Sequence, residues 1–160
     1  DISEEEILTK GILSAVLWAE IREKAFELFK IGQEVAREQG LILVDTKYEF
    51  GLYFDELTLI DEVHTTDSSR YFYVDVYEQR QKDRQPQKQL SKEFLREWLM
   101  KNDFQGLKGQ NLPDLPDSFR IEVYKRYEQL YEQLTGSSFS PTIIEDIDSD
   151  LKTVFFPYIS

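Results

Sequence analysis

The hydrophobic residues near the start of the chain repeat with the period of α-helices. Ser3 and Glu6 have the spacing of a capping box, which predicts a short helix over residues 4–10. From Ser14 onward, apolar positions recur three and four residues apart, and Gly40 is a natural C-terminal stop. The pattern therefore predicts a longer amphipathic helix between Ser14 and Gly40.

After this helix the period changes to that of β-strands. Residues 41–50 combine an apolar, β-branched run with an alternating stretch, and residues 57–63 form a second apolar run. Together they predict an antiparallel hairpin with its turn near Phe54. Residues 71–77 are aromatic and β-branched, which predicts a third strand.

The second half of the chain returns to helical periodicity. Residues 79–89 are polar, basic and interrupted by a proline, so we expect a surface loop there. Helices are expected from Ser91 and from Asp117, the latter ending at Gly136. The apolar tail at 141–160 predicts a terminal helix docked on the body. This order of elements predicts an α+β fold, with an antiparallel sheet backed by helices.

Composition narrows the chemistry. The 160 residues suit one domain and contain no cysteine, which excludes thiol nucleophiles, disulfides and cysteine zinc sites. The single histidine, His64, excludes a two-histidine metal site, although a Ser/His/Asp arrangement stays formally possible. Any metal would be held mainly by carboxylates.

Charge and hydropathy limit the classes of binding partner that this chain can have. No apolar run is long enough to cross a bilayer, and the acidic first residues are unlike a signal peptide, so we expect a cytoplasmic protein without a membrane partner. The formal net charge of -12 argues against nucleic acid as a partner. Small phosphorylated ligands stay possible, because they need only a few basic groups.

The predicted hairpin carries a candidate metal site. Asp45, Lys47 and Glu49 alternate along one strand and share a face, while Asp61 on the partner strand is expected opposite Lys47. A glutamate and an aspartate at that separation suit one magnesium ion with substrate phosphates. The alternative is a solvated hairpin face with an ordinary Lys/Asp pair.

A candidate anion site follows the hairpin. Residues 67–70, Asp-Ser-Ser-Arg, combine hydroxyl groups, turn amides and a guanidinium, which suit a phosphate or a carboxylate. The alternative is a strand-ending turn with Asp67 as its Asx residue. His64 lies just before this turn and could act as a base, but we favour a hydrogen-bonded structural residue.

Two long motifs indicate a family. Residues 40–51, Gly-Leu-Ile-Leu-Val-Asp-Thr-Lys-Tyr-Glu-Phe-Gly, and 60–70, Ile-Asp-Glu-Val-His-Thr-Thr-Asp-Ser-Ser-Arg, strongly resemble SAICAR synthetase, phosphoribosylaminoimidazole-succinocarboxamide synthase. The resemblance continues through 92–99 and 127–136, and covers most of the chain after Gln33 in the family's order. It favours the functional interpretation of both the hairpin and the Asp-Ser-Ser-Arg turn.

The resemblance implies an ATP-grasp-like fold and a ligase of de novo purine biosynthesis. The family joins L-aspartate to the carboxylate of carboxyaminoimidazole ribonucleotide (CAIR), giving SAICAR, ADP and phosphate, with an acyl phosphate as the activated form. On this basis Glu49 and Asp61 match the carboxylates that bind Mg²⁺ and ATP. Asp45 and Lys47 match polar residues of the same pocket, with Lys47 contacting an anionic group.

The resemblance also assigns the substrate side. Asp67 matches an acidic residue near the aminoimidazole. Asp67 and Lys47 are therefore the two candidate catalytic residues. Ser69 and Arg70 match residues near the ribonucleotide phosphate, and Lys92 matches a lysine that contacts an anion.

The chain also departs from the family's pattern. Thr66 stands where proline is usual, and Ser91 and Glu93 flank Lys92 where aspartate and glutamine are common. No segment matches the family's glycine-rich N-terminal lobe, so residues 1–160 are expected to be the C-terminal ATP- and substrate-binding portion, inactive alone. The alternatives are a catalytically silent ligand-binding or interaction domain and a related ATP-using kinase. A homo-oligomer is left open.

Overall fold

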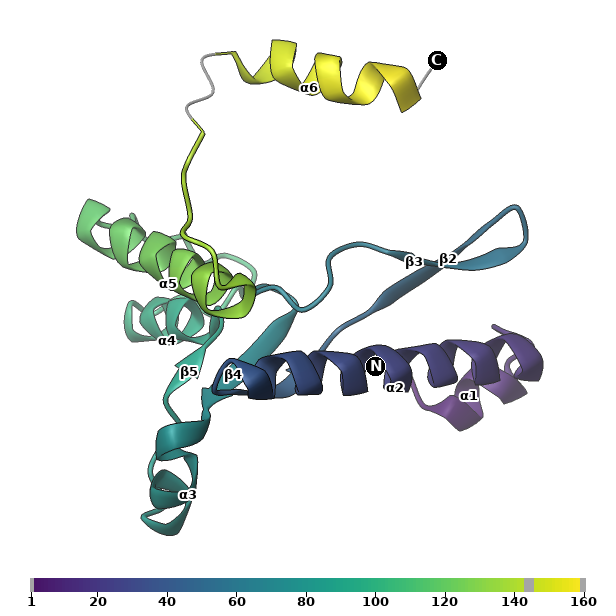
Figure 1. The fold of residues 1–160 in the computed structure, drawn as a ribbon, viewed down its shortest axis with the longest axis horizontal. Coiled ribbons are helices and arrows are strands. Elements are labelled where there is room, and N and C mark those ends of the chain that lie inside the picture. The colour runs from purple at the N-terminus through teal and green to yellow at the C-terminus, as the bar shows by residue number, and fades with distance from the viewer. Residues whose placement is uncertain (1, 143–145, 159–160) are drawn as a thin grey trace.

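The computed structural model describes residues 2–142 and 146–158, and its fold is α+β (Figure 1). The helices are α1 (Glu4–Thr9), α2 (Ala15–Glu38), α3 (Val74–Lys82), α4 (Glu93–Lys101), α5 (Asp117–Thr135) and α6 (Ile147–Phe155), followed by a 3₁₀ turn at Phe156–Tyr158. The strands are β1 (Leu41–Thr46), β2 (Glu49–Tyr53), β3 (Glu56–Ile60), β4 (Ser69–Tyr73) and β5 (Gln89–Leu90).

The starts of α1 and α2 and the ends of α2 and α5 follow capping residues that the sequence supplies, whereas the predicted cap at Asp117 is wrong, because Pro116 is the N-cap of α5 and Asp117 is its first residue. The Ser3 and Glu6 side chains form the predicted capping box at the start of α1. The Ser14 hydroxyl accepts a hydrogen bond from the Leu17 amide at 3.2 Å, which begins α2. Gly40 and Gly136 have φ values of 72° and 66°, the left-handed conformation in which glycine ends a helix without steric cost.

The predicted strand over residues 41–50 is wrong, because the chain changes sheets within it. β1 pairs antiparallel with β4, and β4 pairs antiparallel with β5, giving the strand order β1-β4-β5. β2 pairs only with β3 in a separate two-stranded sheet. Residues 47–48, Lys47 and Tyr48, join the two sheets. Leu41 and Leu43 of β1 are buried in the core, whereas the β2–β3 hairpin extends away from it (Figure 1).

The hairpin turn forms where the sequence predicts it. Phe54 and Asp55 connect β2 to β3 with φ values of 48° and 64°, as a two-residue turn with both φ angles positive requires. Glu49 pairs with Ile60, so β3 ends one residue before Asp61. The expectation that Lys47 faces Asp61 across a ladder is therefore wrong, although their side chains meet.

The strand predicted over residues 71–77 and the loop predicted over residues 79–89 are wrong in part. The structure has a strand only as far as Tyr73, then the helix α3 to Lys82, and β5 begins at Gln89. β4 ends at Tyr73, which pairs with Leu41, the first residue of β1. A longer β4 would have no partner on that side, so the chain turns into α3, and Val74 donates its amide to the Gly40 carbonyl at 3.1 Å. Tertiary context overrides the β propensity of these residues.

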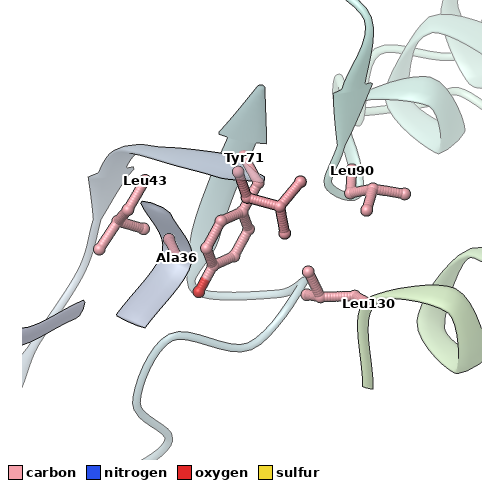
Figure 2. Packing of buried hydrophobic residues seen from close by; sticks show 6 residues of the cluster. Ala36, Leu43, Tyr71, Leu90 and Leu130 are labelled. Atoms are coloured by element: carbon pink, nitrogen blue, oxygen red, sulfur yellow. The ribbon is translucent and has the colours of Figure 1, made fainter. Parts of the chain in front are cut away.

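The core lies between α2, the three-stranded sheet and α5. Its buried members come from five elements, and Figure 2 shows the Tyr71 ring among them. They are Ala36, Leu41, Leu43, Tyr71, Leu90 and Leu130, with Phe29, Tyr73 and Leu134 packed against them. Burial of this cluster fixes β4 and α5 relative to each other, which positions the site described below.

The predicted docking of the terminal helix is wrong. α6 lies away from the body in Figure 1, and its apolar residues Ile147 and Val154 are 60% and 59% exposed. Ile143 and Ile144 of the predicted tail lie outside the described residues. None of the described helices is long and apolar enough to cross a membrane.

Candidate functional site

An ion pair joins the end of β1 to the start of β4. Asp45 and Arg70 are register partners, and the Arg70 guanidinium donates from Nε to Asp45 Oδ1 at 3.3 Å and from Nη2 to Oδ2. This hydrogen bonding raises the pKa of Arg70, which keeps the guanidinium charged. The next pair, Thr46 and Ser69, joins its hydroxyls at 2.8 Å.

The turn before β4 is organised by a threonine. Thr65 Oγ1 accepts hydrogen bonds from the amides of Asp67 and Ser68, both at 3.3 Å, and the Thr65 carbonyl accepts from the Ser69 amide at 2.9 Å. Thr65 therefore takes the role that the structural alternative gave to an Asx residue at position 67. The Asp67 carboxylate instead accepts a hydrogen bond from Tyr127.

A polar cavity of about 210 Å³ opens beside this turn. Its lining contains three cations from two elements together with serine hydroxyls and carboxylates. The lining residues are Asp45, Asp67, Ser68, Ser69, Arg70, Ser91, Lys92, Glu93 and Arg96. Five of them, Asp45, Asp67, Ser69, Arg70 and Lys92, are residues that the sequence indicates for catalysis or substrate binding. Asp45 pairs with Arg70 and Glu93 pairs with Arg96, so the charges of the lining largely balance. The cavity still offers an anion the guanidinium and ammonium donors together with serine hydroxyl groups.

The α4 side of the cavity contains residues that the sequence interpretation missed. The buried Ser91 accepts a hydrogen bond from the amide of Glu93, the first residue of α4, at 3.2 Å, which ties the start of the helix to the cavity. Arg96 follows Lys92 by four residues and pairs with Glu93 at 2.8 Å. Helical spacing of Lys92 and Arg96 on one face is the signal that could have identified the second cation.

A second polar group lies where the two sheets join. Lys47 hydrogen bonds to Glu49, and its Nζ lies 3.6 Å from Asp61 Oδ2. The hydrogen bond that Lys47 donates to Glu49 is the main cause that raises the pKa of Lys47. These residues are outside the cavity lining, but the Lys47 amide donates to the Ser68 carbonyl at 3.0 Å, which ties the group to the turn.

The two carboxylates of this group suit a divalent cation in part. Glu49 and Asp61 are exposed and converge on one ammonium, so both carboxylates reach a common position. Within residues 2–142 and 146–158, no group of three or more aspartate, glutamate or histidine side chains could hold a metal ion. Magnesium bound here would therefore take its other ligands from phosphate and water, which is its usual coordination in nucleotide sites.

His64 has a structural environment. Its Nε2 lies 2.6 Å from the Tyr48 hydroxyl, and its carbonyl accepts a hydrogen bond from the buried Tyr71 at 2.7 Å. Burial lowers the pKa of His64, so the ring is neutral at physiological pH. Burial also raises the pKa of Tyr71 to about 12. These contacts agree with the structural role favoured for His64.

The comparison with protein families identifies the chain. The family model described as SAICAR synthetase matches residues 1–111. The chain belongs to the SAICAR synthetase family. This result confirms the resemblance carried by residues 40–51 and 60–70, and with it a family of ligases of purine biosynthesis.

Known SAICAR synthetases match the chain in sequence and in fold. The phosphoribosylaminoimidazole-succinocarboxamide synthase of Cytophaga hutchinsonii is 52% identical over 139 residues, which are 87% of this chain and 45% of the relative. The SAICAR synthase of Saccharomyces cerevisiae, solved in complex with SAICAR, is 34% identical with a TM-score of 0.62, covering 78% of this chain and 40% of that one.

A third SAICAR synthetase, solved in complex with ADP, shares the fold at 23% identity and a TM-score of 0.58, covering 88% of this chain and 46% of that one. The chain spans about half the length of the curated relatives it matches.

Proposed function

We propose that the described residues form the substrate side and part of the ATP side of a ligase that joins L-aspartate to CAIR and converts ATP to ADP and phosphate. The observation that carries this proposal is the convergence of the two family segments, 40–51 and 60–70, on one polar cavity that contains three basic side chains. The S. cerevisiae relative is solved with SAICAR, the product expected of this reaction. The cavity suits the phosphate of such a ribonucleotide.

In the proposed complex, Ser69, Arg70 and Lys92 bind the ribonucleotide phosphate. Arg70 uses Nε and Nη2 to pair with Asp45, and among the described residues its Nη1 has no hydrogen bond, so this nitrogen is available to an anion. Asp67 accepts a hydrogen bond from the amino group of the aminoimidazole. The ligand is then held at its charged end and at its base.

The group at Lys47 belongs to the ATP side of the proposed site. Glu49 and Asp61 would hold Mg²⁺, which when bound neutralises phosphate charge. Lys47 then contacts an anionic oxygen, because its ammonium is a mobile point charge on a long chain. The remaining part of the ATP site, a glycine-rich lobe, is proposed to come from another portion of the same protein, of which these residues are the C-terminal portion.

The proposed reaction has two balanced steps. The γ-phosphoryl group of ATP transfers to a carboxylate oxygen of CAIR, and ADP leaves. The amine of L-aspartate then attacks the acyl carbon, phosphate leaves with its bridging oxygen, and the amine loses a proton as the amide forms. The residues of this chain hold the ribonucleotide in place for both steps, which lowers the entropic part of the barrier.

The ligase proposal is tested with the complete protein that contains these residues. SAICAR formation should require ATP, CAIR and L-aspartate together. Phosphate release that does not depend on L-aspartate would exclude the ligase and favour a kinase. Binding of ATP and CAIR without turnover by the complete protein would favour a silent binding domain.

The magnesium assignment has a matched control within one hairpin. Glu49→Gln should lower kcat at least roughly tenfold, because one metal ligand is lost. Glu56→Gln, at the far end of the same hairpin, should leave kcat unchanged. Steady-state kinetics over a magnesium titration measure both variants. Equal kcat for Glu49→Gln and the unmutated protein would show that Glu49 does not hold the metal.

A further inference from the structure

A hydrogen bond joins α5 to the turn of the candidate site. The Tyr127 hydroxyl donates to Asp67 Oδ1 at 2.6 Å, across 60 residues of sequence. Asp67 lines the polar cavity, whereas Tyr127 does not. Tyr127 also lies beyond residues 1–111, the part of the chain that matches the family model. The contact therefore links a segment outside that match to a side chain in the cavity.

The turn backbone does not depend on this contact. Thr65 accepts hydrogen bonds from the amides of Asp67, Ser68 and Ser69, and the Thr66 carbonyl accepts from the Lys92 amide at 3.3 Å. The main chain at Asp67 is thus held by its neighbours and by the start of α4. What Tyr127 adds is the orientation of the Asp67 side chain.

The charge state of Tyr127 suits this role. Burial against the turn and the hydrogen bond to Asp67 raise the pKa of Tyr127 to about 12. The phenol is therefore a hydrogen-bond donor at neutral pH. With Oδ1 occupied, Oδ2 of Asp67 accepts no hydrogen bond within residues 2–142 and 146–158, which leaves it for a donor on a ligand.

We propose that Tyr127 is a positioning residue that holds the Asp67 carboxylate so that Oδ2 meets the amino group of the ribonucleotide base. This inference rests on the proposed function. A hydrogen bond to a charged partner restrains the carboxylate more strongly than a neutral one. Phenylalanine at this position keeps the ring and removes only the hydroxyl, so it tests the oxygen alone.

The test compares two tyrosines on α5 in the complete protein. Tyr127→Phe should raise the KM for CAIR roughly tenfold, because the lost bond involves a charged group, while the KM for ATP stays unchanged. Tyr124→Phe is the matched control, since Tyr124 lies one turn away and bonds weakly to Glu128 at 3.4 Å. It should leave both KM values unchanged.

A double-mutant cycle separates positioning from structural support. In an Asp67→Ala background, Tyr127→Phe should add nothing to the KM for CAIR, because the oxygen has no carboxylate left to hold. An additive effect, an equal rise in the KM for ATP, or an unchanged KM for CAIR would overturn the inference. Failure of the unmutated complete protein to use L-aspartate would instead overturn the proposed ligase function, and the two failures are distinguishable.

Discussion

Arg70 combines two tasks that a lysine could not. Its planar guanidinium places two nitrogens on the Asp45 carboxylate and leaves a third for a ligand. Both partners are partly exposed, so solvent screens the pair and its contribution to stability is small. The value of the contact lies in orientation, because it directs a fixed positive charge toward the cavity.

The lowered pKa of His64 makes the stability of the protein depend on pH. Burial lowers the folded-state pKa below the ordinary value of 6.5. The unfolded chain therefore binds a proton more readily than the folded chain does. The free energy of unfolding is thus highest above pH 6.5, and it falls as pH decreases from 6.5 through the folded-state pKa of His64. Imidazole NMR signals of this single histidine should give a pKa below 6.5. His64→Gln should flatten the stability slope between about pH 7.5 and 5.5; an unshifted NMR titration would contradict the effect of burial.

At the residue scale, the sequence predicts most of the cavity. Ser69, Arg70 and Lys92 meet there as the motifs indicate. Asp45 joins them as the cross-strand partner of Arg70, whereas the sequence placed it on one face with Lys47 and Glu49, which lie outside the lining. Tyr127 could not be assigned in this way. Its place on a helical stripe indicates the core, and only the packing of α5 against the sheet brings its hydroxyl to the turn.

At the scale of elements, α2 approaches the turn segment at a glycine. A Cβ atom on Gly32 would lie 2.3 Å from Cε1 of the His64 ring, which is closer than atoms can pack. Alanine at this mid-helix position would otherwise favour the helix by about 1 kcal/mol. The close approach of the ring is therefore the reason that glycine fits here.

Gly32→Ala should lower the unfolding free energy by about 1–3 kcal/mol through overpacking against His64. Chemical denaturation of the variant measures this loss. In a His64→Ala background the same substitution should become stabilising, because the helix preference remains and the ring is gone. The same sign in both backgrounds would mean that the contact with His64 does not restrict position 32.

The mispredicted strands share one physical cause. Alternation along residues 41–50 correctly indicates extended chain, but periodicity does not specify a strand's partner, and β1 and β2 have different ones. Likewise, Val74 and Tyr77 favour strands intrinsically, yet β4 loses its partner at Tyr73. The starts of α1 and α2 were predictable because their capping serines act locally, whereas Lys92 and Pro116, the N-caps of α4 and α5, make no side-chain cap hydrogen bond.

At the scale of the whole molecule, the C-terminal helix does not contribute to the buried core. α6 presents exposed apolar residues and lies apart from the body (Figure 1). Removing residues 141–160 should therefore change the unfolding free energy by no more than about 0.5 kcal/mol. Leu130→Ala, a buried position on α5, should lower it by about 2–5 kcal/mol.

Denaturant unfolding of the 160-residue chain and the two variants measures this contrast. A large loss of stability on truncation would indicate that the tail packs on the body in solution. The tail prediction failed because an amphipathic pattern reports that a face is apolar, not which surface covers it.

The junction at Lys47 and Tyr48 places the Glu49 and Asp61 carboxylates at the base of the β2–β3 hairpin, where the hairpin joins the rest of the chain. Glu49 lies at the base of the hairpin, whereas Phe54 lies at its tip, about 15 Å away at the usual rise of a strand. Rotation about the junction moves the tip through a wide arc and Glu49 through a short one. A fluorophore at position 54 would therefore report hairpin movement while the spacing between the carboxylates and the cavity stays nearly constant.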